Sequence, residues 1–171
     1  MKIIGIILIL LAGTSFGMYY SFKPIYRKND LLEMKRAILI LNSEIKFLST
    51  SIKEALLAIE NSIALPIKNI FFNFRQNIEK RRGEELYLIW EESLQKSSKN
   101  TYFIKEDIEK FKMIGKSIGS YDKELNLNSL NIILDYIDTS IKDIENEKLK
   151  NMKMYQSVGI LGSLALIILL I

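Results

Sequence analysis

The feature that most constrains this chain is a long uncharged stretch near its start. Ile3–Phe22 contains no charged residue and is mostly aliphatic. As a helix rising ~1.5 Å per residue, twenty residues span ~30 Å, which is the thickness of the hydrocarbon core of a bilayer. A second, shorter uncharged run, Val158–Ile171, follows at the other end. We therefore expect transmembrane helices at residues 1–22 and 154–171.

Basic residues predict how the first stretch is oriented. Only Lys2 precedes it, whereas five bases follow it closely: Lys23, Arg27, Lys28, Lys35 and Arg36. Because basic residues accumulate on the cytoplasmic side of a span, residues 23–153 are expected in the cytoplasm and both termini outside. A cleaved signal peptide is the alternative, since residues 13–17 are small enough for a cleavage site. Signal peptides carry their positive charge before the apolar run, however, so the distribution of charge favours a retained anchor.

The composition excludes several classes of function. The chain has no cysteine and no histidine, so disulfides, zinc sites of the usual kinds and His-dependent catalysis are excluded. No glycine-rich phosphate loop is present, and we expect no cofactor. Twenty acidic and 24 basic residues are interspersed, with a net charge of +4. This balance does not indicate nucleic-acid binding.

The spacing of apolar residues predicts an all-α fold. Between the two spans, six apolar stripes with a step of three and four residues predict a six-helix cytoplasmic bundle. They cover residues 31–48, 52–63, 67–78, 86–94, 104–118 and 127–144. Pro24 is expected to break or kink the first helix as it leaves the membrane. Ser51 and Glu54 have the spacing of a capping box at the start of the second helix.

The first and last stripes have a heptad-like rhythm, and each adjoins a predicted span. We expect these two helices to pack antiparallel as a stalk or central pair, with the shorter helices covering them. On this hypothesis Leu41 and Leu134 do not lie on opposite outer faces.

Glu84-Glu85 and Glu91-Glu92 are candidate paired carboxylates for acid–base catalysis. Neighbouring residues of a helix point in different directions, so neither Glu84-Glu85 nor Glu91-Glu92 is expected to form a shared site. We predict a protein that is not an enzyme, and a carboxylate-dependent membrane enzyme is the alternative.

Two exposed regions are candidate contacts for a partner. Lys80, Arg81 and Arg82 form a basic run that is either an ordinary solvated turn or a contact to lipid or protein. Gly119 and Asp122 flank the turn before the last helix, where Asp122 either caps that helix or contacts a partner.

Four residues are predicted to have structural roles. Pro66 suits the first turn of a helix, and Trp90 follows the buried face of its helix. Gly115 indicates close packing of two helices, with a hinge as the alternative, and Gly119 indicates a helix end.

The order of these features resembles that of the stage III sporulation protein AB family over the full length of the chain. The features that carry the resemblance are Gly5, Gly17, Leu41-x-x-Glu44-Ile45, Glu54-Ala55-Leu56, Pro66-Ile67-x-x-Ile70-Phe71, Trp90, Ile114-Gly115-x-x-Ile118-Gly119-x-x-Asp122 and Tyr155-x-x-x-Gly159-Ile160-Leu161-Gly162. Ser51 stands where the family usually has proline, and Asn126 where it usually has glutamine.

The resemblance implies a function that the residues alone do not. Proteins of this family look like the membrane platform of type II secretion systems, with a secretion F-type helical domain. They are expected in the mother-cell membrane around the forespore, as a scaffold of a channel complex. The implied partner is a cytoplasmic secretion-type ATPase, stage III sporulation protein AA, and a homo-oligomer is compatible with this role. An unrelated membrane-anchored adaptor or signalling subunit is the alternative.

Overall fold

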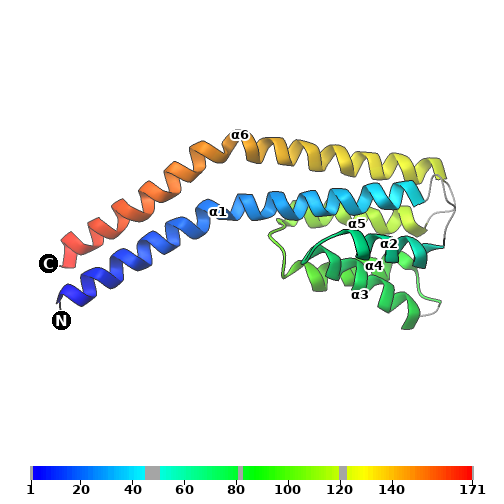
Figure 1. Ribbon diagram of the computed structural model, residues 1–171, viewed down its shortest axis with the longest axis horizontal. Helices are drawn as coiled ribbons and strands as arrows, with labels where there is room; N and C mark the ends of the chain where they lie inside the picture. The colour runs from blue at the N-terminus through cyan, green and yellow to red at the C-terminus, as the bar shows by residue number, and fades with distance from the viewer. Residues whose placement is uncertain (1, 45–50, 81–82, 120–122, 171) are drawn as a thin grey trace. The chain divides into compact units, whose positions relative to one another are not determined.

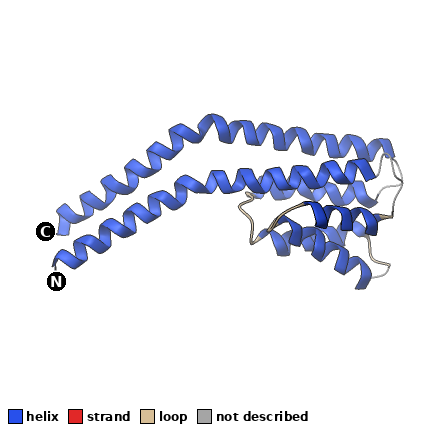
Figure 2. Ribbon diagram, in the orientation of Figure 1, coloured by secondary structure: helices blue, strands red, loops and turns tan. Residues whose placement is uncertain are grey.

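The protein is all-α, as the sequence predicted. The computed structural model describes residues 2–44, 51–80, 83–119 and 123–170, and Figure 2 shows only helices and loops among them. The helices are α1 (Lys2–Ser43), α2 (Ile52–Ser62), α3 (Ile67–Lys80), α4 (Leu86–Ser98), α5 (Lys105–Gly119) and α6 (Lys123–Leu170) (Figure 1).

The chain divides into two compact units. Arg27–Ile141 forms a helical unit that contains α2 to α5 together with the adjoining parts of α1 and α6. Met1–Tyr26 and Lys142–Ile171 form the other, terminal unit. Among the described residues, no helix combines the length and apolarity that a membrane crossing requires.

The predicted break at Pro24 is wrong, because α1 continues through it. Pro24 lies inside the 42-residue helix Lys2–Ser43. A proline inside a helix removes one backbone hydrogen bond and crowds the preceding turn, at a cost of about 3 kcal/mol. Several helical turns lie on each side of Pro24, and the helix tolerates this single defect.

The antiparallel pairing of the two heptad-bearing helices is confirmed within the helical unit. There α1 and α6 run side by side in opposite directions (Figure 1), and the ammonium group of Lys35 on α1 pairs with the carboxylate of Asp138 on α6. The core residues that these two helices supply include Leu31, Met34, Ile38 and Leu41 of α1 and Leu130, Ile133 and Ile137 of α6. Leu134 is half-buried, so it does not face away from the core. Ile45 and Leu48, also predicted in this seam, lie outside the described residues.

The short helices pack in chain order, α2 on α3, α3 on α4 and α4 on α5. The predicted capping box starts α2: the Ser51 hydroxyl accepts from the Glu54 amide at 3.4 Å, and the Glu54 carboxylate accepts from the Ser51 amide at 3.1 Å. Pro66 lies directly before the first residue of α3 rather than inside its first turn, and its peptide bond to Leu65 is cis.

Candidate functional site

Of the residues predicted to contact a partner, the structure describes Lys80 and Gly119. Lys80 is exposed at the last position of α3, and Gly119 is the last residue of α5. Arg81, Arg82 and Asp122 lie outside the described residues. Their role as a contact surface therefore remains a prediction.

Arg75, which is near Lys80 in sequence, does not belong to an exposed basic surface. Its guanidinium donates to both carboxylate oxygens of Glu60, at 2.7 and 3.0 Å. Glu60 is buried, and the hydrogen bonds to it raise the pKa of Arg75. This pair joins α2 to α3.

Trp90 and Gly115 form the contact between α4 and α5. Trp90 is fully buried, and its indole nitrogen donates to the backbone carbonyl of Phe111 at 2.8 Å. The rings of Phe71 and Phe74 lie 5.4 and 5.2 Å from the Trp90 ring. A Cβ atom on Gly115 would lie 2.7 Å from Trp90 Cδ1. Gly115 therefore allows the close approach that the sequence indicated.

The carboxylate of Asp107 on α5 accepts hydrogen bonds from three parts of the helical unit. It is fully buried, and its two oxygens accept from the Arg27 guanidinium at 2.7 and 2.8 Å. The Tyr136 hydroxyl donates to the same carboxylate at 2.8 Å. The Ile104 backbone amide also donates to it at 2.8 Å, which caps the start of α5. We call Arg27, Asp107 and Tyr136 the Asp107 cluster.

The electrostatics of the cluster favour a charged pair with a neutral phenol. The hydrogen bonds that Arg27 donates to Asp107 raise the pKa of the guanidinium above its ordinary value. Burial, with the hydrogen bond to Asp107 as the second cause, raises the pKa of Tyr136 to about 12. At neutral pH, Tyr136 is therefore a hydrogen-bond donor. The cluster fixes α1, α5 and α6 to one another through one carboxylate.

Two further acids of α1 hold the connections between the short helices. Asp30 accepts from the backbone amide of Tyr102 at 2.7 Å, in the segment between α4 and α5. Burial raises the pKa of Asp30, and the bond from Tyr102 opposes that shift. Glu33 accepts from the backbone amide of Ala64 at 2.8 Å, in the segment between α2 and α3. Through these contacts α1 organises the rest of the unit.

These polar groups act as structural links between elements of the helical unit. Asp107, Glu60 and Asp30 each use their carboxylate to join two helices or a helix and a loop. Within the described ranges, no three acidic residues are grouped so that they would hold a metal ion. Buried polar networks whose members are all paired make the structure that they connect more rigid.

Sequence reasoning missed the buried acids Glu60 and Asp107, although a signal was present for each. Glu60 is four residues after Leu56 and three before Ile63, so it falls on the apolar stripe of α2. Asp107 likewise falls between Ile104 and Phe111 on the stripe of α5. A charged residue at an apolar position indicates a buried pair, but it does not identify the partner. Arg27 is 80 positions from Asp107.

Comparison with known proteins agrees with this architecture. A family model described as stage III sporulation protein AB matches residues 2–171. The chain belongs to the stage III sporulation protein AB family. Stage III sporulation protein AB of Bacillus subtilis (strain 168) is 28% identical over 172 residues, covering 99% of each chain. A solved structure of a stage III sporulation protein AB has the same fold, with a TM-score of 0.68 and 22% identity over 73% of this chain and 98% of that chain.

Membership of the stage III sporulation protein AB family gives the chain a role in sporulation. The family is named for this process and not for a catalysed reaction. The resemblance that was based on sequence features alone is confirmed.

Proposed function

We propose that the chain is a membrane platform of a sporulation complex between mother cell and forespore, and that its helical unit couples to a cytoplasmic ATPase. The observation that carries the proposal is the continuity of α1 and α6. Each is a single helix that contains one of the uncharged stretches and also supplies core residues to the helical unit. A displacement of the unit would thus act directly on both stretches.

The proposal includes a location and an orientation. Ile3–Phe22 and the last apolar stretch anchor the chain in the mother-cell membrane around the forespore. The distribution of basic residues puts residues 23–153 in the cytoplasm and both termini outside. The proposed partner is the secretion-type ATPase of the same complex, stage III sporulation protein AA. The scaffold works without chemistry of its own, as a mechanical link with the Asp107 cluster fixing α1 and α6.

The first test locates the helical unit. Because the chain contains no cysteine, single cysteines can be introduced at exposed positions such as Gln95 and tested for labelling by a membrane-impermeant maleimide in intact cells. We expect Gln95→Cys to be labelled only after the cells are permeabilised. Labelling of intact cells would refute the proposed orientation.

The second test concerns the ATPase. The full-length protein is co-purified with the ATPase in the presence and absence of nucleotide, as wild type and as the variant K80E/R81E/R82E. We expect this variant to lose binding. The matched control is K96E/K99E/K105E, which has the same change of charge at three exposed lysines elsewhere. Equal binding by both variants would refute the contact, and no binding by the wild type would refute the coupling.

A further inference from the structure

Two connections of the helical unit lie at the end where α1 enters it. Successive helices of the unit run in opposite directions, so their connections alternate between its two ends (Figure 1). Arg27 is the first residue of the unit on α1. Close to it, Asp30 accepts from the Tyr102 amide in the α4–α5 connection, and Glu33 accepts from the Ala64 amide in the α2–α3 connection. These hydrogen bonds hold both connections beside the start of the unit.

The two connections are basic and contain no acidic residue. We call residues 61–69 and 95–105 the basal surface. Its charged residues are all lysines: Lys68, Lys96, Lys99 and Lys105. The last three of them are exposed. The other connections of the unit each contain at least one acidic residue, within residues 44–51, 81–85 and 120–122. Positive charge without compensating acids therefore distinguishes the basal surface.

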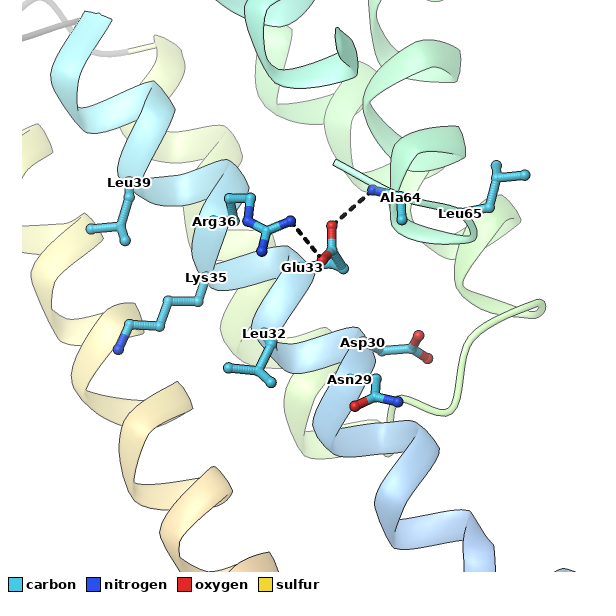
Figure 3. A pocket seen from close by; sticks show the side chains of 9 residues that line it. All are labelled: Asn29, Asp30, Leu32, Glu33, Lys35, Arg36, Leu39, Ala64 and Leu65. Carbon is cyan, nitrogen blue, oxygen red and sulfur yellow. Dashed lines mark hydrogen bonds and ion pairs between the residues drawn. The ribbon is translucent and has the colours of Figure 1, made fainter. Parts of the chain in front are cut away.

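Each part of the basal surface also exposes one large apolar side chain. Leu65 is 66% exposed and Ile104 is 40% exposed. Figure 3 shows Leu65 beyond the hydrogen bond from Ala64 to Glu33, with its side chain directed away from α1. Exposed apolar groups next to lysines are typical of segments that bind an anionic bilayer surface. The apolar groups enter the boundary of the acyl chains, while the ammonium groups stay among the headgroups.

The position of the basal surface along the chain selects a bilayer as its partner. Arg27 follows Phe22, the end of the first uncharged stretch, by five positions of one continuous helix. Five helical residues rise about 7.5 Å, which is close to the Debye length of about 8 Å at physiological ionic strength. Because the chain itself tethers this surface to the bilayer, the effective concentration of the bilayer exceeds that of a soluble partner.

We propose that the basal surface binds anionic lipid headgroups of the membrane in which the uncharged stretches are anchored. Lys96, Lys99 and Lys105 contact lipid phosphates, and Leu65 and Ile104 enter the boundary between headgroups and acyl chains. This inference rests on the proposed membrane location and adds a class of lipid to it. Neutral lipid would anchor the uncharged stretches equally well, but it would not hold the helical unit against the surface.

The absence of natural cysteine allows one fluorescent label on the basal surface. Full-length Ile104→Cys is labelled and reconstituted into lipid nanodiscs that contain a headgroup-linked quencher, with or without anionic phosphatidylglycerol. We expect strong quenching in anionic discs at low salt, and weak quenching in neutral discs or at high salt, because salt screens the lysines. The control is labelled Leu88→Cys, since Leu88 is 53% exposed in the first turn of α4, away from its basal end. Equal quenching of the two labels, or quenching that ignores lipid charge, would overturn the proposal.

Charge reversal tests which residues make the contact. In the Ile104→Cys background, K96E/K99E/K105E should lose the quenching. Each lysine near an anionic surface contributes about fivefold to binding, and three contribute about a hundredfold. K80E/R81E/R82E makes the same change of charge elsewhere and should keep the quenching. Quenching that survives in K96E/K99E/K105E would contradict the assignment. An unquenched wild type, with loss of ATPase binding by K96E/K99E/K105E, would assign the lysines to a protein partner and refute the lipid contact.

Flotation separates this inference from the proposed function. The same protein is reconstituted into liposomes, washed in alkaline carbonate and centrifuged through a density gradient. Protein that floats with the lipid, but whose label on Ile104→Cys is not quenched, would keep the membrane anchor and refute the basal contact. Protein that does not float would refute the membrane location and the basal contact together.

Discussion

Replacing Asp107 by asparagine should destabilise the helical unit strongly. The Asp107 carboxylate accepts four hydrogen bonds, two from Arg27 and one each from Tyr136 and the Ile104 amide. An amide has one acceptor oxygen, and its nitrogen would face donors on at least one side. The variant also leaves the Arg27 charge without a counter-ion, with its side chain only 17% exposed.

The expected loss follows from this geometry. Removing one partner of a buried ion pair costs 3–5 kcal/mol, and the partial exposure of Arg27 indicates the lower end, about 3 kcal/mol. For a chain of this length, that loss lowers the melting temperature by about 6–12 °C. The assay is thermal unfolding of the full-length protein in detergent, followed by circular dichroism.

The control is Glu109→Gln on the same helix. Glu109 is 56% exposed and pairs with Lys112 one turn away, so its substitution should change the stability by less than about 0.5 kcal/mol. A loss of about 1 kcal/mol or less for Asp107→Asn would refute the reasoning, because a solvent-exposed ion pair contributes no more than that to the free energy of unfolding. We also expect R27M/D107L to recover part of the loss, since no unpaired charge remains buried.

Three further predictions concern single residues. Gly115→Ala should lower the free energy of unfolding by about 1–3 kcal/mol in the same assay, because the new Cβ meets Trp90 at 2.7 Å. In an alkaline titration followed by phenolate absorbance, Tyr136→Phe should remove a phase near pH 12. The protonated phenol stabilises the fold; its contribution is full below an unfolded pKa of about 10 and is lost as the pH rises through 12. Asp30→Asn should stabilise the protein at pH 7, since an amide oxygen still accepts from Tyr102 without the cost of a buried charge.

Each of these predictions has its own control. Gly162→Ala should not destabilise the protein, because no atom lies within 4 Å of the added Cβ. The phase near pH 12 should persist in variants that keep Tyr136; its persistence in Tyr136→Phe would contradict the assignment. Because burial raises the pKa of Asp30, the wild type gains stability relative to Asp30→Asn as the pH falls. A gap that widens in acid would contradict that sign.

Much of the fold was predictable because helix signals are local. The step of three and four residues predicted all six helices, and Ser51 with Glu54 predicted the start of α2. At Pro24 the sequence left a break and a kink open, and the structure excludes the break; a local signal at a proline does not contain the contribution of the turns on either side. The predicted stripe ended at residue 94, whereas α4 continues to Ser98. Ser97 is buried, and its hydroxyl accepts from the Asn73 side-chain amide at 2.9 Å.

The sequence by itself determined the fold class, the family and the buried position of Trp90, because periodicity, capping and composition depend on neighbouring residues. Only the tertiary structure decided that Asp107 joins Arg27 and Tyr136, and that Leu65 and Ile104 lie at one end of the helical unit. The position of Asp107 on the apolar stripe of α5 indicates burial but does not identify its partner. That partner is the Arg27 guanidinium, 80 positions away, which sequence spacing does not locate and which the packing of α1 on α5 brings within 2.7 Å.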